Sequence, residues 1–336
     1  MTSLGLSVLD LSPVPAGKTP RDALENSIDL ARHAEAIGLT RVWLAEHHNA
    51  ASLVSSAPEI LIAQIAAATK TLRVGAGGIM LPNHSPLKVA ELFRVLSALF
   101  PERIDLGLGR AAGTDPRTAF ALRRAAPHAS ADDFPEQMTD LMGYLDDTGE
   151  PRGPFARTVR AVPTGVPTPP VWILGSSDYG GAFAAKAGFG FAFAHHINPH
   201  DSVVTLKKYR AEFKPSKYWP KPRSILTLAA ACGSTERDIH EIQLTSGLAA
   251  LRFATGLRDL PYPTVDEAKS HVWSEEDLAL VRGVGARGFI GTPKEVSGSI
   301  RSLAETCDVD EVMVLTHTHS HELRKQSYTL LKEALG

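Results

Sequence analysis

The sequence has few cysteines, no long hydrophobic run and no excess of charge of either sign. Its two cysteines, Cys232 and Cys307, are far apart and fit no CxxC or Cys/His spacing, which argues against a disulfide framework or a zinc ribbon and favours a reducing compartment. Lys and Arg number 35 against 37 Asp and Glu. This near balance gives no basic surface of the kind that binds nucleic acid.

Export and membrane signals are absent as well. The first apolar run has no Lys or Arg ahead of it and is interrupted by Asp10, so it is not a signal peptide. The longest apolar stretch, residues 60–68, is broken by Gln64 and falls far short of the roughly 18 residues that span a bilayer. We therefore expect a cytoplasmic protein without nucleic-acid or membrane partners.

What the sequence does have is a regular alternation of short apolar runs and helical patterns. The first helix is marked by Thr19 as N-cap, Pro20 at the first helical position and Gly38 at the end. Eight strands are expected, at residues 4–11, 41–45, 72–76, 103–108, 170–174, 190–194, 224–232 and 311–316. Between the last two, residues 235–288 are expected to be largely helical, and GTPKEV then marks a helix start.

Strands separated by helices predict parallel βαβ units, and eight of them favour a closed barrel over an open sheet. With no repeat or linker, residues 1–336 are predicted to form one domain, a (β/α)8 TIM barrel with insertions at its C-terminal face. The insertion at residues 111–130, Tyr218-Trp219-Pro220 and the long excursion before the last strand are expected to roof the barrel mouth.

Chemistry in such barrels gathers at the carboxyl ends of the strands, where this sequence concentrates histidine and glycine. One glycine-rich segment, Gly107-x-Gly109, follows a strand but lacks dinucleotide spacing and a following helix, so a Rossmann site is rejected. Another, residues 175–177, precedes a helix and could seat a phosphate on unpaired backbone N–H groups. Arg110 favours that interpretation over simple N-capping by serine, whereas Asp178 opposes it unless its side chain points away.

Several ordered motifs then point to one family. They are AEHHN, VGAGGIMLPNHSPLKVAE, ERIDLGLGRAAGTD, WILGSSDYGGAFAAKAG, FAFAHH and GTPKEV. Together they resemble the bacterial luciferase-like flavin monooxygenases, in particular the alkanal-monooxygenase-like branch. The resemblance implies an enzyme that takes reduced FMN (FMNH2) from a separate flavin reductase. It also implies reaction of that flavin with O2, as co-substrate, through a C4a-peroxide that oxygenates a small organic substrate such as an aldehyde.

The resemblance also assigns residues. It places His47 near the reactive edge of the flavin with His48 beside it, and these two are the expected catalytic residues. The expected cofactor-binding residues are Ala76, Gly77, Gly78 and Ile79, against which the family lays its ring system, often with a non-proline cis peptide, and Arg110, Gly175, Ser176 and Ser177 at the phosphate. Bacterial luciferase carries a cysteine where this chain has Gly109, so light emission is not inferred.

Two alternatives stay open at this stage. His317, His319 and His321, together with His47, His48, Asp10 and Glu46, resemble the ligand types of a zinc-dependent barrel hydrolase. No metal site is expected, because such barrels usually carry their HxH motif at the first strand. A zinc site would also leave Arg110 and the Gly-Ser-Ser helix start unexplained. A barrel that binds flavin without turning over is the other alternative.

Two expectations remain. For four further histidines, the sequence favours pocket lining and loop packing about equally: His195, His196, His317 and His319. The helix at residues 58–69 carries more isoleucine, leucine and alanine than one barrel wall needs, and together with the helix after the third strand it predicts a homodimer.

Overall fold

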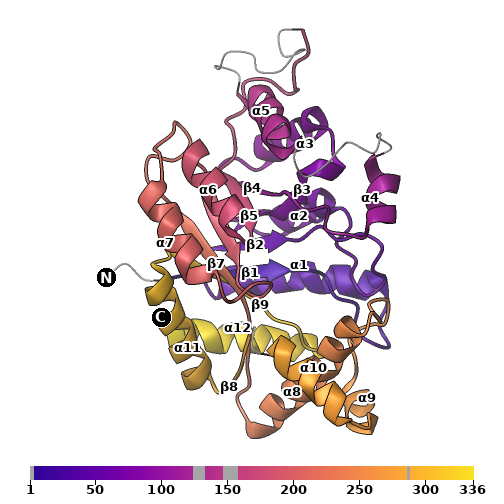
Figure 1. Cartoon of the computed structure of the whole chain (residues 1–336). Coiled ribbons are helices and arrows are strands. Elements are labelled where there is room, and N and C mark those ends of the chain that lie inside the picture. The colour runs from indigo at the N-terminus through magenta and orange to yellow at the C-terminus, as the bar shows by residue number, and fades with distance from the viewer. Residues whose placement is uncertain (1–3, 124–132, 147–157, 286–287) are drawn as a thin grey trace.

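Eight parallel strands close into a barrel in the computed structural model, which describes residues 4–123, 133–146, 158–285 and 288–336 (Figure 1). Around the barrel the strands follow chain order except that β7 is followed by β9, which pairs with β1 and so completes the ring. These strands are β1 (Gly5–Asp10), β2 (Arg41–Leu44), β3 (Arg73–Met80), β4 (Ile104–Gly109), β5 (Val171–Gly175), β6 (Gly190–Ala194), β7 (Ser224–Cys232) and β9 (Glu311–Leu315). The predicted (β/α)8 barrel and all eight of its strands are confirmed.

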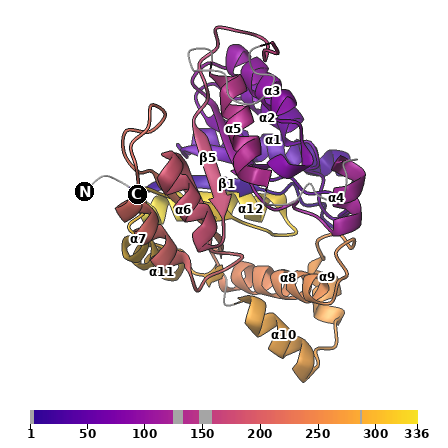
Figure 2. The same cartoon turned by 45° about the horizontal axis from the view of Figure 1, so that its top comes forward.

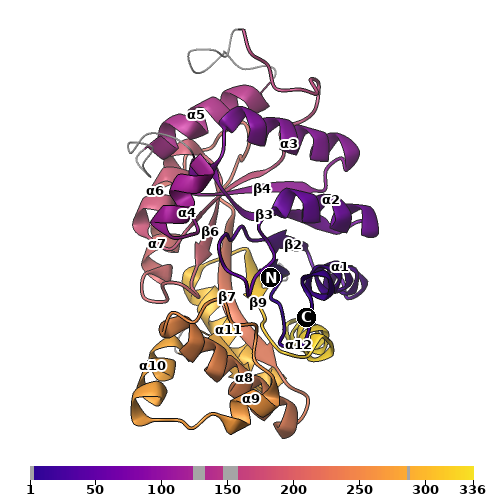
Figure 3. The same cartoon turned by 90° about the vertical axis from the view of Figure 1, so that its right-hand side faces the viewer.

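Helices surround the barrel (Figure 3), and the two helix starts predicted from the sequence carry side-chain caps. Thr19 caps the first helix through the Asp22 amide, and Thr292 caps the GTPKEV helix through the Glu295 amide. The outer helices are α1 (Pro20–Ala36), α2 (Pro58–Ala68), α3 (Pro86–Leu99), α5 (Phe134–Leu145), α6 (Asp178–Ala187), α7 (Ser202–Glu212), α11 (Pro293–Cys307) and α12 (His321–Leu335), with the short η1 (Leu81–Asn83) after β3. No helix in the described part of the chain is long and apolar enough to cross a membrane.

The excursion at residues 235–288 differs from the expected helical stretch. It contains α8 (Glu236–Ala254), α9 (Val265–Ser270) and α10 (Glu275–Gly285), followed by a ninth strand, β8 (Gly288–Gly291). β7 is longer than its neighbour β9, so its last residues leave backbone groups that β8 pairs in parallel. A strand of four residues with a glycine at each end carries too little periodicity to be predicted from the sequence.

The same excursion, which was expected to roof the barrel mouth, contacts the loop after β1 and the segment after β9 (Figure 2). Tyr262 exchanges backbone hydrogen bonds with Val14 and Ala16 in the loop after β1, and its hydroxyl donates to the carbonyl of His317 after β9. Of the predicted roof at residues 111–130, the structure describes α4 (Pro116–Arg123), which lies over the loop after β2, whereas residues 124–132 lie outside the described part.

The opposite end of the barrel is closed by tryptophans, which corrects one expectation. Trp219 was expected at the mouth, but its Nε1 donates to the carbonyl of Val171, the first residue of β5. Its ring packs edge-on against Trp172, whose ring packs in the same way against Trp43. The reason is topological, because a segment between a helix and the next strand returns the chain to the N-terminal end of the barrel. Tyr218-Trp219-Pro220 therefore belongs to the floor.

Candidate functional site

A cavity of about 290 Å³ opens at the C-terminal ends of the strands. Residues from β1 to β7 and from β9 contribute to its wall, and the wall is mostly apolar. Its polar groups are few, and except for Thr227 in β7 they come from the segments that follow β2, β4, β5 and β6. A largely apolar cavity with a small number of convergent polar groups is typical of a cofactor or small-molecule site.

One end of this cavity is positively charged. Arg110, directly after β4, lies with its guanidinium carbon 4.0 Å from the centre of the Tyr179 ring. Face-on stacking of this kind leaves the N–H groups at the edge of the guanidinium available to a ligand. No carboxylate among the described residues pairs with Arg110. Asp178 turns toward Lys208 instead, with 2.8 Å between Oδ2 and Nζ, so the unfavourable neighbour noted in the sequence points away.

The predicted Gly-Ser-Ser segment lies at the same end. Gly175, Ser176 and Ser177 all line the cavity with Arg110. Ser177 occupies the N-cap position of α6, but its side chain makes no capping hydrogen bond, so its hydroxyl is not committed to the helix. A guanidinium, serine hydroxyls and the start of a ten-residue helix together form a suitable seat for a phosphate.

The end of β3 forms a glycine wall. The Gly77–Gly78 peptide bond is cis, and Gly77 lines the cavity. A Cβ on Gly77 would lie 2.9 Å from Cβ of Trp43 and 3.0 Å from Cδ1 of Leu9, so the wall there is bare backbone. Of the other predicted residues in this segment, Ala76, Gly78 and Ile79 are buried, and the side chains of Ala76 and Ile79 pack in the main hydrophobic core. They could meet a ligand only through backbone atoms.

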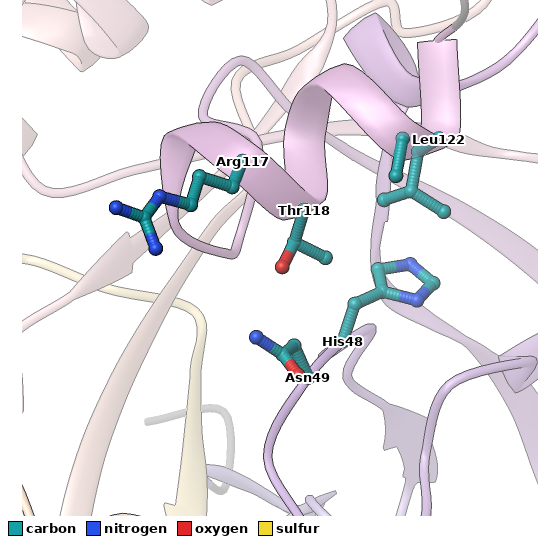
Figure 4. A pocket seen from close by; sticks show the side chains of 6 residues that line it. His48, Asn49, Arg117, Thr118 and Leu122 are labelled. Atoms are coloured by element: carbon teal, nitrogen blue, oxygen red, sulfur yellow. The ribbon is translucent and has the colours of Figure 1, made fainter.

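The two predicted catalytic histidines line two different hollows. His47 lines the cavity, and burial lowers its pKa below the ordinary value, although a hydrogen bond with the Gly113 backbone and the charge of Glu46 oppose this effect. His48 lines a different, open hollow of about 510 Å³ together with Asn49 and residues of α4 (Figure 4). Its Nε2 lies 2.9 Å from Oε1 of Glu46.

Glu46 is the site residue that the sequence analysis undervalued. It lines the cavity and is 1% exposed, and its carboxylate accepts hydrogen bonds from the Met80 amide at 2.9 Å and from the rings of His48 and His84. Burial raises the pKa of Glu46, but His84, the Met80 amide and His48 outweigh burial and leave it below its usual value. The available signal was an acidic residue at the end of a fully buried strand.

The remaining histidines at the strand ends divide between the two expected roles. His196 lines the cavity and holds the Thr227 carbonyl through Nδ1 at 3.2 Å, and burial lowers its pKa to about 4. His195 is buried against the hydroxyl of Ser202. His317 packs edge-on against Tyr262, and burial lowers its pKa to about 3. His319 lies 3.1 Å from the carbonyl of Ala16.

The side chains that the zinc hydrolase alternative would need as ligands do not point to one common site. His319 faces Ala16, whereas His321 pairs with Asp29 at 2.8 Å and His317 packs on Tyr262. Asp10 is held by Arg324, with 2.8 Å between Oδ1 and Nη2. Within the residues that the structure describes, no group of three or more His, Cys, Asp or Glu side chains has an arrangement that could hold a metal ion.

Comparisons with known proteins agree with this geometry. The family model for luciferase-like monooxygenases matches residues 5–309. The chain belongs to the luciferase-like monooxygenase family. A luciferase-like monooxygenase of Escherichia coli K12 is 40% identical over 334 residues, which cover 98% of this chain and 96% of that protein. The flavin-dependent monooxygenase activity of the family is therefore the activity of this chain.

Solved structures extend the likeness to three dimensions. The structure of apo-MsnO8 superposes with a TM-score of 0.86 at 35% identity and covers 98% of both chains. The oxygenating constituent of 3,6-diketocamphane monooxygenase from Pseudomonas putida, solved in complex with FMN, has a TM-score of 0.71 at 17% identity and covers 99% of this chain and 97% of that one. At that identity the second structure shows that the fold is shared.

Proposed function

We propose that this luciferase-like monooxygenase binds FMN in its reduced form and uses O2 to oxygenate a small organic substrate. The observation that carries the proposal is Arg110, which pairs with no carboxylate among the described residues, beside Ser176 and Ser177 at one end of a mostly apolar cavity. Such a site suits a ligand with one anionic end and a flat apolar body. A protein of the same fold that was solved in complex with FMN supports the choice of ligand.

The residues present fit FMN. Arg110, Gly175, Ser176 and Ser177 would hold its phosphate, and the bare backbone at Gly77 would face the ring system, because a side chain there would collide with Trp43 and Leu9. Ala76, Gly78 and Ile79 would contribute backbone only. When bound, reduced FMN supplies the two electrons and the reaction with O2 that the protein side chains cannot supply.

The protein contributes orientation, exclusion of water and proton transfer. The apolar wall keeps solvent away from the reacting groups, which limits unproductive release of hydrogen peroxide. His47 faces the cavity, and burial lowers its pKa and so favours the neutral ring, which can accept a proton or donate its N–H to a bound group. His48 faces the outer hollow, and we assign it a supporting role through Glu46.

A separate flavin reductase is proposed as the source of reduced FMN. Gly107-x-Gly109 lies inside β4 with no helix directly after it, so it is not a loop that would bind a nicotinamide dinucleotide as electron donor. Both cysteines are buried and form no disulfide with each other, which suits the reducing cytoplasm where we expect the oxygenase and its reductase to work.

The experiment is a turnover assay with photoreduced FMN, 18O2 and a panel of aldehydes, thioethers and ketones, read by mass spectrometry. The proposal expects one 18O atom in the organic product and one in water. If reduced FMN is bound and reoxidised but every substrate gives hydrogen peroxide alone, the protein is the non-catalytic flavin-binding barrel. Lack of binding by FMN, oxidised or reduced, would refute the proposal altogether.

A homodimer through α2 and α3 is also proposed. On α2, Leu61, Ile62 and Ile65 pack on the barrel, but Ile60 is 63% exposed, and on α3 Leu99 is 63% exposed. These residues leave an apolar surface that a second copy would cover. Light scattering at micromolar concentration should give twice the chain mass, and Ile60→Asp combined with Leu99→Asp should give the monomer. A monomeric wild-type protein would contradict the proposal.

A further inference from the structure

Glu46 and His84 together connect the cavity with solvent. The Glu46 carboxylate lines the cavity and is 1% exposed, whereas the His84 side chain, in the segment after η1, is 31% exposed. His84 Nε2 lies 2.9 Å from Oε1 and 3.0 Å from Oε2 of Glu46. A single histidine thus spans the distance from a buried cavity wall to the surface, and both contacts are within hydrogen-bond range.

Burial favours the neutral form of the two histidines that face the cavity, His47 and His196. Burial lowers the pKa of His47 below its ordinary value and lowers that of His196 to about 4. His84 behaves in the opposite way, because the hydrogen bond and the charge of Glu46 outweigh the effect of burial and raise its pKa. The contact with Glu46 therefore favours the protonated form of His84, at hydrogen-bond distance from a carboxylate that lines the cavity.

We propose that Glu46 and His84 form the route by which a proton passes between solvent and the cavity. The proton leaves Nε2 of His84 for the Glu46 carboxylate, which passes it to the group bound in the cavity, and His84 takes up another proton from water. No electrons move, and Glu46 ends as the carboxylate that it was. This inference rests on the proposed function, because it needs a cavity occupant that accepts protons.

The surroundings of the pair suit this role. The Met80 amide and His48 Nε2 each donate to Glu46 at 2.9 Å and fix the carboxylate. The charged and titratable groups that bear on the pair are His47 and His48 on the same loop and Glu59 on α2. Glu59 raises the pKa of His84 further, so it favours the protonated form that the route requires.

The first test uses the protein without flavin. Histidine Cε1–H resonances are titrated by NMR in the wild type and in Glu46→Gln, with His84→Gln used to assign the signal. The His84 pKa should lie above the ordinary value in the wild type and fall by about one unit or more in Glu46→Gln, since an opposite charge at hydrogen-bond distance is removed. An unchanged His84 pKa would overturn the pairing on which the route depends.

The second test follows product formation against pH with reduced FMN and O2. The wild-type rate should fall as pH rises through the His84 pKa. In His84→Gln the amide can still donate a hydrogen bond to Glu46 but cannot gain or release a proton. That pH dependence should therefore vanish, and the rate below the His84 pKa should fall by about a hundredfold. FMN affinity should stay the same.

His271→Gln is the matched control. His271 also pairs with a carboxylate, Asp277, at 3.3 Å, but it lies in the excursion between β7 and β8 and does not line the cavity. Its profile should match the wild type. A His84→Gln variant that keeps the wild-type pH profile would refute the route. Failure of the wild type to bind FMN would refute both proposals, and the flavin-free titration tells these results apart.

Discussion

Two arginines at opposite ends of the barrel, Arg41 at the floor and Arg110 at the mouth, have different partners. At the floor, Asp105 is fully buried and accepts hydrogen bonds from Arg41, Arg73 and the Trp43 indole, and Arg41 also pairs with Glu311 at 2.9 Å. At the mouth, Arg110 has an aromatic ring but no carboxylate beneath it among the described residues. Charges that are satisfied internally hold a fold together, whereas a cation left without an anion can receive one from a ligand.

Packing follows the same division. The floor is filled by Trp172 and Trp219 in edge-on contact, and Trp172 packs in the same way against Trp43, which also reaches the cavity wall. The mouth keeps a cavity of about 290 Å³ whose wall includes bare glycine backbone. Changes at the floor should therefore alter stability more than ligand binding, whereas changes at His47 and Arg110 should alter turnover or ligand binding more than stability.

The largest expected effect is on turnover, in His47→Ala. Loss of a proton-handling group at the cavity lowers rates by about 10²–10⁴-fold, so the ratio of organic product to hydrogen peroxide per reduced FMN should fall accordingly. Unfolding free energy and FMN affinity should stay near those of the wild type. An unchanged ratio in the folded variant would remove His47 from the mechanism.

Asp105→Ala should produce the converse result at the floor. It leaves the guanidinium groups of Arg41 and Arg73 without their shared carboxylate, and breaking a buried ion pair costs about 3–5 kcal/mol. Urea unfolding should show this loss, while the folded fraction keeps its FMN affinity. Stability within 1 kcal/mol of the wild type would show that the floor network contributes little.

Mild acid should affect the mouth first. His196 has a folded-state pKa of about 4 against about 6.5 when unfolded, so the unfolded chain binds more protons between these values and stability falls as pH falls. From pH 7 to pH 5 this one group should cost about 2 kcal/mol. Unfolding measured at both pH values should show a smaller difference in His196→Gln, and an equal difference would contradict the assignment.

The sequence predicted the barrel well because its signals are local. Strand lengths, capping residues such as Thr19 and Thr292, and the turn at Gly38 each follow from neighbouring residues. β8 was not predicted because it is stabilised by pairing with the end of β7, which is distant in the chain. Trp219 was misplaced for a related reason, since the sequence of a loop does not say which end of the barrel it covers.

The candidate site was predictable in kind and less so in detail. The cavity brings together His47, Gly77, Arg110, Gly175, Ser176 and Ser177 as the motifs indicated. The division between His47 and His48 could not be predicted, because adjacent residues in a loop can face different hollows. Nor could the role of Glu46, which depends on His84 arriving from the segment after β3.

The central claim is that Arg110 holds the phosphate of FMN, and paired binding measurements test it most directly. Kd for FMN and for riboflavin is measured in the wild type, in Arg110→Ala and in Arg117→Ala, an exposed arginine on α4 that serves as the control. A charge-assisted contact of about 1.5–3 kcal/mol predicts that Arg110→Ala binds FMN roughly ten- to a hundredfold more weakly while riboflavin binding hardly changes. Equal weakening of both ligands, or tight riboflavin binding by the wild type, would contradict the account.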